Sequence, residues 1–139
     1  MMLVLDASMV LSWIFERADA AERDLADRAL QALSGASASV PALWHVEVAN
    51  ALLVGERRRV ITPVQGADFL RRLDRLSIRV DVAETAAHRD AIMALARLYD
   101  LTAYDACYLE LALRSSGALA SFDAKLIKAA GAAGIAVFQ

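Results

Sequence analysis

The chain has few of the residues that would cross-link it, bind zinc or anchor it in a membrane. With one cysteine, Cys107, in 139 residues it cannot form an internal disulfide, and we expect a buried, unreactive thiol. The only histidines, His45 and His88, are isolated and read as ordinary helix residues, so the Cys and His set of a zinc site is missing. No uninterrupted apolar run approaches the roughly 18 residues of a bilayer span. These absences exclude disulfide-stabilised, zinc-binding and membrane-spanning classes.

The hydrophobic residues, 58% of the chain, include many alanines, which favour helices. The length lies within the span of roughly 100 to 200 residues expected for one domain. No repeat, low-complexity segment or linker interrupts the chain. The amino terminus does not resemble a secretion signal, because Asp6 interrupts the first apolar run too early. We therefore expect one soluble domain over residues 1–139, located in the cytoplasm.

Short apolar runs alternate with helical patterns along the chain. Strands are predicted near residues 2–5, 37–40, 78–82, 118–122 and 135–138, and helices near 20–33, 41–58, 64–76, 83–99, 103–114 and 124–132. Pro41 and Pro63 are each expected in the first turn of a helix. The alternation predicts a three-layer α/β/α fold with a mainly parallel, about five-stranded central sheet.

Two of the predicted strands lead directly into an aspartate. Asp6 follows the first strand, and Asp123 follows the strand near residues 118–122. In open α/β sheets ligands bind at the carboxyl ends of the strands, so both carboxylates are placed to meet one. Ser8 and Ser121 lie two residues after Asp6 and two before Asp123. Their hydroxyls could order a water or hydrogen-bond a ligating carboxylate, or simply start a helix.

Glu47 is the most informative acidic residue, because it lies within an apolar helical segment. Its neighbours three and four residues away are Leu43, Trp44, Asn50 and Ala51. Burying a lone carboxylate on such a face is costly, and the nearest charges on its C-terminal side begin only at Glu56. This position favours a functional role for Glu47.

Helix capping is the competing explanation for the aspartates. Thr102 to Asp105 has capping-box spacing, Asp123 could cap the last helix, and Asp6 could accept from the amides that follow it. Capping does not explain why two strands end in Asp or why Glu47 lies on an apolar face. Four carboxylates in one cleft would repel one another unless cations were bound, and Mg²⁺ or Mn²⁺ prefers oxygen ligands. The sequence therefore predicts a metal site formed by Asp6, Glu47, Asp105 and Asp123.

Basic residues gather in the middle of the chain, at Arg57, Arg58 and Arg59 and at Arg71, Arg72 and Arg75. The formal net charge of −2 argues weakly against a nucleic-acid binder. Setting aside four carboxylates as a metal-neutralised cluster leaves +2, so a polyanion could be held beside the acidic centre. The arginines could equally form a solvated surface.

Four segments resemble the acidic motifs of PIN-domain ribonucleases in order and spacing. They are Leu5 to Ser8, Glu47 with Asn50, Leu101 to Ala106, and Ser121 to Asp123. The resemblance spans residues 3–137 and is strongest to the VapC-type toxins of bacterial and archaeal toxin–antitoxin pairs. Ser121 departs from the usual threonine of the family, but both residues carry a hydroxyl.

The resemblance implies a Mg²⁺- or Mn²⁺-dependent endoribonuclease that acts on structured RNA such as tRNA or rRNA. It also implies a cognate VapB-type antitoxin as inhibitor and, often, a homodimer. Asp6, Glu47, Asp105 and Asp123 would then be the catalytic metal-binding residues, with Asp6 and Asp105 as direct ligands. Ser8, Asn50 and Ser121 would support them, and the six arginines are candidate RNA contacts.

Two other classes also collect carboxylates at strand ends. A receiver-like phosphotransfer domain would need a phosphoacceptor Asp on a middle strand and a lysine ending a later strand. Asp81 instead lies in an alternating strand, and Lys125 lies inside a helix, which argues against this class. A non-catalytic module whose acidic cleft binds a basic segment of a partner remains open.

Overall fold

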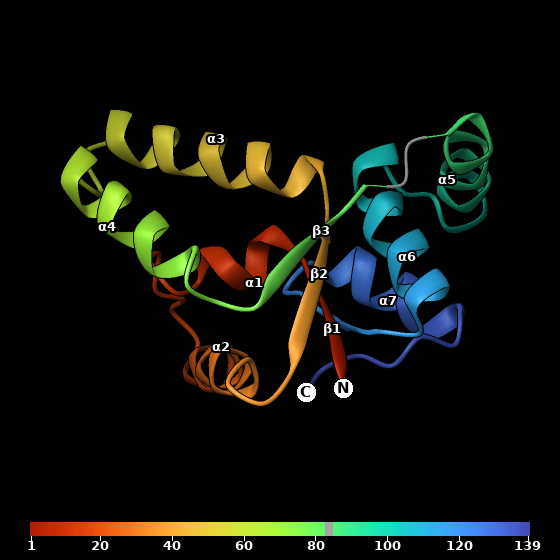
Figure 1. Ribbon diagram of the computed structural model, residues 1–139, viewed down its shortest axis with the longest axis horizontal. Coiled ribbons are helices and arrows are strands. Elements are labelled where there is room, and N and C mark those ends of the chain that lie inside the picture. The colour runs from red at the N-terminus through yellow and green to blue at the C-terminus, as the bar shows by residue number, and fades with distance from the viewer. Residues whose placement is uncertain (83–84) are drawn as a thin grey trace.

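Four parallel strands form the central layer of the computed structural model, which describes residues 1–82 and 85–139 (Figure 1). The strands are β1 (Met2–Leu5), β2 (Ser37–Pro41), β3 (Ile78–Asp81) and β4 (Ala118–Ala120). Their order in the sheet is β3-β2-β1-β4, so β1 has a neighbour on each side. Its residues Leu3, Val4 and Leu5 are fully buried, as expected for a parallel strand covered on both faces.

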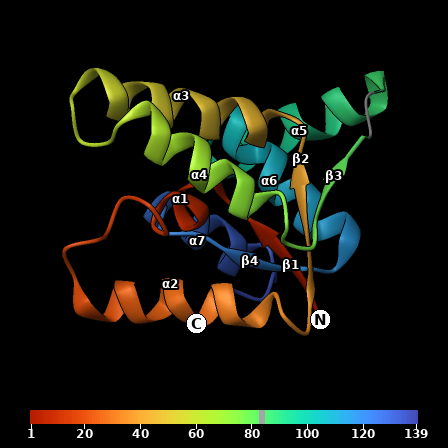
Figure 2. The same ribbon diagram turned by 60° about the vertical axis from the view of Figure 1, so that its left-hand side comes forward.

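Helices cover both faces of this sheet and complete the three-layer α/β/α fold expected from the sequence (Figures 1 and 2). One layer contains α1 (Ala7–Leu11), α2 (Ala20–Ala32), α3 (Leu43–Arg57) and α4 (Pro63–Leu73). The other contains α5 (Ala86–Tyr99), α6 (Ala103–Ser115) and α7 (Ala124–Ala132). Within the described residues, none of these helices has the length and apolarity needed to cross a bilayer.

The later strands lie on both sides of β1 in the sheet, and this arrangement creates a switch point at the carboxyl ends of the strands. β2 and β3 extend the sheet on one side of β1, whereas β4 returns to its other side. Loops on the two sides diverge at such a point and leave a crevice in which ligands bind. The register pairs Leu5 with Ala120, so the next residues, Asp6 and Ser121, lie beside each other at this edge.

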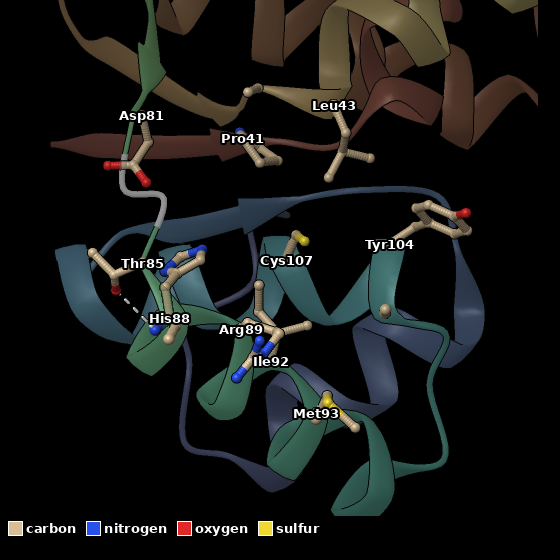
Figure 3. Close-up of a pocket in the computed structure, with 13 residues that line it drawn as sticks. Pro41, Leu43, Asp81, Thr85, His88, Arg89, Ile92, Met93, Tyr104 and Cys107 are labelled. Carbon is tan, nitrogen blue, oxygen red and sulfur yellow. Dashed lines mark hydrogen bonds between the residues drawn. The ribbon is translucent and has the colours of Figure 1, made fainter.

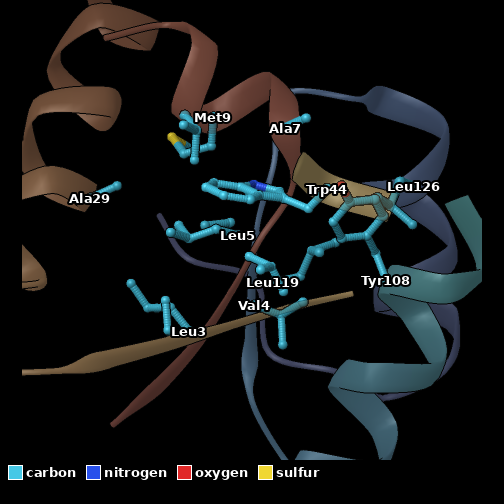
Figure 4. Packing of buried hydrophobic residues seen from close by; sticks show 14 of the residues in the cluster. Leu3, Val4, Leu5, Ala7, Met9, Ala29, Trp44, Tyr108, Leu119 and Leu126 are labelled. Carbon is cyan, nitrogen blue, oxygen red and sulfur yellow. The ribbon is translucent and has the colours of Figure 1, made fainter. Parts of the chain in front are cut away.

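The core around β1 is packed from both layers (Figure 4). Met9 and the indole of Trp44 cover it from the side of α1 and α3, and Tyr108 and Leu126 lie on the side of α6 and α7. All four side chains are at most 2% exposed. Burial of each large apolar side chain contributes roughly 1.5–3 kcal/mol, so this packing fixes the strand that carries Asp6.

The predicted number of strands is wrong by one, because residues 135–138 do not form a full strand. Val137 makes an isolated parallel bridge to Leu119. The Leu119 amide donates to the Ala136 carbonyl at 2.9 Å, and the Phe138 amide donates to the Leu119 carbonyl at 2.8 Å. β4 is only three residues long, so a strand beside it finds little backbone to pair with.

Several element boundaries also differ from those predicted. Pro41 is the last residue of β2 rather than part of a helix, and α3 begins at Leu43. Pro63 does open α4, where Thr62 and Gln65 form a capping box. The helix predicted from residue 83 begins at Ala86, and residues 83 and 84 lie outside the described part of the chain.

Candidate functional site

Asp6 is a buried carboxylate held by two serine hydroxyls. It follows β1, and its side chain is only 6% exposed. Ser8 Oγ donates to Asp6 Oδ2 at 2.6 Å, and Ser121 Oγ donates to the same oxygen at 2.7 Å. Burial raises the pKa of Asp6, and the negative charge of Asp123 raises it further, against the lowering effect of the serine hydrogen bonds. Its carboxylate does not serve as a side-chain cap for α1.

The same two serines join the ends of β1 and β4, and we call them the serine clamp. Ser8 Oγ accepts a hydrogen bond from the Phe122 amide at 2.9 Å, and Ser121 Oγ accepts one from the Asp123 amide at 2.9 Å. The backbone after Ala120 therefore turns toward Asp6, which is why β4 ends before the predicted residue 122. The clamp fixes the position of Asp123 relative to Asp6.

Replacing Ser121 by alanine tests the clamp. Ser121 is 2% exposed, and its loss removes one of the two hydroxyl hydrogen bonds to Asp6 Oδ2 and leaves the Asp123 amide without the Ser121 hydroxyl. We expect the free energy of unfolding to fall by about 1–3 kcal/mol in urea denaturation. The control is Ser34→Ala, because Ser34 Oγ donates to the Gln31 carbonyl at an exposed position; its effect should stay within about 0.5 kcal/mol. Equal effects of the two changes would contradict this role.

Glu47 lies on α3 and accepts a hydrogen bond from a tyrosine that the sequence analysis did not identify. Tyr108 Oη donates to Glu47 Oε1 at 2.5 Å. Burial raises the pKa of Glu47, and the charges of Asp6 and Asp105 add to the rise, while the Tyr108 hydrogen bond opposes it. Tyr108 is fully buried and lies three residues after Asp105, hence on the same face of α6. The three-residue spacing between Asp105 and Tyr108 was the sequence pattern that could have identified Tyr108 as a site residue.

Asp105 and Asp123 differ in how far helix capping explains them. The Asp105 amide donates to Thr102 Oγ1 at 3.1 Å, so Thr102 provides the cap and the Asp105 carboxylate is not needed for it. Asp123 does cap α7, because its Oδ1 accepts from the Leu126 amide at 2.9 Å. The pKa of Asp105 is raised by burial first, and then by the charges of Asp123 and Asp6.

The four acidic residues, which we call the carboxylate cluster, lie close enough for their charges to affect the pKa values of Asp6, Glu47 and Asp105. Each of Asp6, Glu47 and Asp105 has its pKa raised by the charge of at least one other member, and Asp123 acts on two of them. As the side chains stand, however, no three Asp, Glu, His or Cys residues within 1–82 and 85–139 are gathered closely enough to hold one metal ion. The hydrogen bonds to the serine clamp, Tyr108 and the start of α7 hold the carboxylates in separate directions.

The remaining predicted site residues lie farther from the cluster. Asn50 is exposed on α3, one turn after Glu47. All six candidate RNA-binding arginines are exposed. Arg57 is ten residues beyond Glu47 on α3, about 15 Å along the helix axis, and Arg58 and Arg59 follow it. Arg71 and Arg72 pair with Asp68 at 3.5 and 3.1 Å.

A groove of about 650 Å³ opens at the start of α6 (Figure 3). Its walls come from the segment joining β2 to α3, from α5 and from the start of α6, and are mainly apolar. The groove is lined by Leu43, which is close in sequence to Glu47, and by Tyr104, which precedes Asp105. Cys107, a free thiol that is only half-buried, also lines the groove; burial raises its pKa, in keeping with an unreactive thiol. The carboxylates themselves do not line this groove.

A family model described as the PIN domain matches residues 3–132, a range that contains most of β1, all of β4 and the whole carboxylate cluster. The chain belongs to the PIN domain family. PIN domains are generally nucleases, and many of them use divalent metal ions. No curated protein shows significant sequence similarity to this PIN domain.

Solved structures with the same fold agree with this assignment. PAE2754 from Pyrobaculum aerophilum has 21% identity and a TM-score of 0.66, with 92% of this chain and 78% of that chain covered. FitAcB from Neisseria gonorrhoeae has 18% identity and a TM-score of 0.64, covering 100% and 97%. A toxin-antitoxin complex from Klebsiella pneumoniae has 17% identity and a TM-score of 0.57, covering 87% and 85%. At these identities the likeness establishes the fold.

Proposed function

We propose that this PIN domain is a VapC-type toxin, a Mg²⁺- or Mn²⁺-dependent endoribonuclease that hydrolyses phosphodiester bonds in structured RNA such as tRNA or rRNA. A cognate VapB-type antitoxin would neutralise it in the cytoplasm, and the active form would be a homodimer. The observation that supports the proposal most is the placement of Asp6. It is buried at the switch point, held by hydroxyls instead of capping α1, and coupled by charge to Glu47, Asp105 and Asp123.

The donor set suits a hard divalent cation. All four side chains offer carboxylate oxygens. Burial first, and then mutual repulsion, raises the pKa values of Asp6, Glu47 and Asp105, and a bound cation would oppose this rise. Asp6 and Asp105 would hold the ion directly, with Glu47 and Asp123 as further ligands or as residues that position water. When bound, such an ion supplies acidified water and offsets the charge that develops on phosphate oxygens.

The protein's own groups prepare the site for hydrolysis. The serine clamp fixes Asp6 and Asp123 on the two sides of the switch point. Tyr108 holds the Glu47 carboxylate through a hydrogen bond, so that Glu47 could bind the ion or position a water. The β1 core beneath keeps this arrangement rigid. No covalent enzyme intermediate is needed, because water attacks the phosphorus directly.

The antitoxin part of the proposal draws on relatives of the same fold, one of which is a toxin-antitoxin complex. A small DNA-binding protein encoded beside this chain would be the candidate inhibitor. Expression of the chain alone should stop growth, and co-expression with that protein should restore it.

The direct test is RNA cleavage by the purified protein. We expect it to cut a mixture of tRNA and rRNA in the presence of Mg²⁺ or Mn²⁺, at defined positions found by sequencing the new RNA ends. Addition of EDTA should stop cleavage, and excess Mg²⁺ should restore it. Intact RNA with both metals would overturn the proposal.

A further inference from the structure

The sheet edge that carries the cluster is acidic, so RNA needs cations close by to approach it. Arg57, Arg58 and Arg59 lie at the far end of α3 from Glu47. Two other basic residues lie nearer, one packed on Phe122 and one two residues after Asp123. They are Arg17, in the connection between α1 and α2, and Lys125, in the first turn of α7.

Arg17 lies on the aromatic ring next to the cluster. Its Cζ is 4.3 Å from the centroid of the Phe122 ring, a cation–π geometry. Phe122 stands between Ser121 and Asp123, and its amide is held by the serine clamp, so the ring has a fixed relation to the carboxylates. The Arg17 guanidinium is therefore positioned through Phe122 rather than free in solvent.

Neighbouring residues bond to only some of the polar groups of Arg17 in the described part of the chain. Its Nε donates to Glu22, and its backbone carbonyl accepts from Arg23 Nη1 at 2.9 Å, which anchors the connection between α1 and α2. Within residues 1–82 and 85–139, the terminal Nη1 and Nη2 groups of Arg17 have no hydrogen-bond partner. A guanidinium with free terminal N–H groups, held over an aromatic ring, is suited to a phosphate.

Lys125 lies two residues after Asp123, in the first turn of α7. Its ammonium is 3.2 Å from Asp100 Oδ2, in the joint that leads to Asp105. Its charge lowers the pKa of Asp105, in opposition to the other carboxylates. The ion pair is exposed, with 60% of the Lys125 and 96% of the Asp100 side chain accessible, so a phosphate can replace Asp100 at little cost.

We propose that Arg17 and Lys125 bind the RNA backbone at phosphates next to the scissile bond, one on each side of Asp123. This inference rests on the proposed nuclease function and names the residues that bring its substrate to the site. Arg17 would hold a phosphate through its planar N–H groups, and Lys125 would hold one as a point charge. The exposed arginines of α3 and α4 would then add long-range attraction at most.

The test compares RNA binding and cleavage in Arg17→Gln and Lys125→Gln. Binding of a fluorescein-labelled, mixed-sequence RNA oligonucleotide is measured in the cleavage-deficient Asp6→Asn background, between about 50 and 200 mM KCl. We expect each change to weaken binding about tenfold and to lower the slope of log K against log salt by about 0.7–0.9. In the active protein, KM should rise more than kcat falls. Lys128→Gln on α7 and Arg28→Gln on α2 are the controls, and both should bind as the parent does.

Arg17→Lys separates phosphate binding from simple packing on Phe122. It retains the charge, so it should recover most of the salt slope that Arg17→Gln loses. A lower melting temperature of Arg17→Gln with an unchanged salt slope would overturn the inference and leave Arg17 a packing role only. Wild-type cleavage with unchanged binding by both Gln variants would overturn the inference alone. If the wild type cuts no RNA with either metal, the proposed function fails and this inference fails with it.

Discussion

Asp6→Asn is expected to lower RNA cleavage by more than about 100-fold while the protein stays folded. Changes in residues that merely orient metal ligands already cost about 10–100-fold, and Asp6 is proposed as a ligand itself. Asparagine keeps the shape of the side chain and an oxygen that can accept from Ser8 and Ser121. Because burial raises the pKa of Asp6, removal of its charge should leave the free energy of unfolding equal or slightly higher. Cleavage rates and urea denaturation measure the two effects.

Asp105→Asn and Asp123→Asn should lose cleavage in the same way. Asparagine caps a helix about as well as aspartate, so Asp123→Asn retains the cap of α7. The matched control is Asp19→Asn, since Asp19 caps α2 through the Glu22 amide at 3.1 Å and is not a member of the cluster. Its variant should cleave normally. Full cleavage by all three site variants would favour the alternative of a non-catalytic module that binds a basic partner.

The second large effect concerns divalent metal and the stability of the protein. Asp6, Glu47 and Asp105 have raised pKa values in the folded state, so protonation of these groups is coupled to folding. Their contribution to stability is fully present below the unfolded pKa values of about 4, and it is lost as pH rises through the folded values. Without metal, these three groups should therefore make the protein less stable at pH 7 than at pH 4.

Addition of Mg²⁺ or Mn²⁺ at pH 7 should reverse that loss. Metal that binds only the folded state adds about 2.7 kcal/mol when its concentration is 100 times the dissociation constant. At pH 4 the metal competes with protons for the carboxylates, so its effect should largely disappear. Melting temperature measured with and without MgCl₂ or MnCl₂ at each pH tests this, with NaCl of equal ionic strength as control. Equal melting temperatures at pH 7 would show that the four carboxylates do not form a metal site.

The sequence was most informative about features that depend on local patterns of residues. The apolar run of β1 predicts a buried central strand, and the order of strands and helices predicts the parallel three-layer fold. Ser8 and Ser121 were predicted to be able to hydrogen-bond a ligating carboxylate, and both contact Asp6. Whether the four acidic residues act as metal ligands stays a prediction.

The errors and omissions have a common cause, because they depend on contacts between distant segments. Residues 135–138 have the composition of a strand, but β4 is too short to pair with them along their length. Pro41 suits the first turn of a helix, yet pairing with Asp81 extends β2 to include it. The bond from Tyr108 to Glu47 joins α6 to α3, and only the assembled layers reveal it.

The serine clamp also sets the stage of folding at which the proposed RNA-cleavage site is complete. Ser121 and Asp6 are 115 positions apart in the chain, and contacts of such long range form late and slowly. A chain that has folded its first layer alone holds Asp6 and Ser8 but lacks Ser121 and Asp123, which follow β4. Under the proposed function, RNA cleavage would therefore arise only when the whole architecture is complete, and folding intermediates would leave RNA intact.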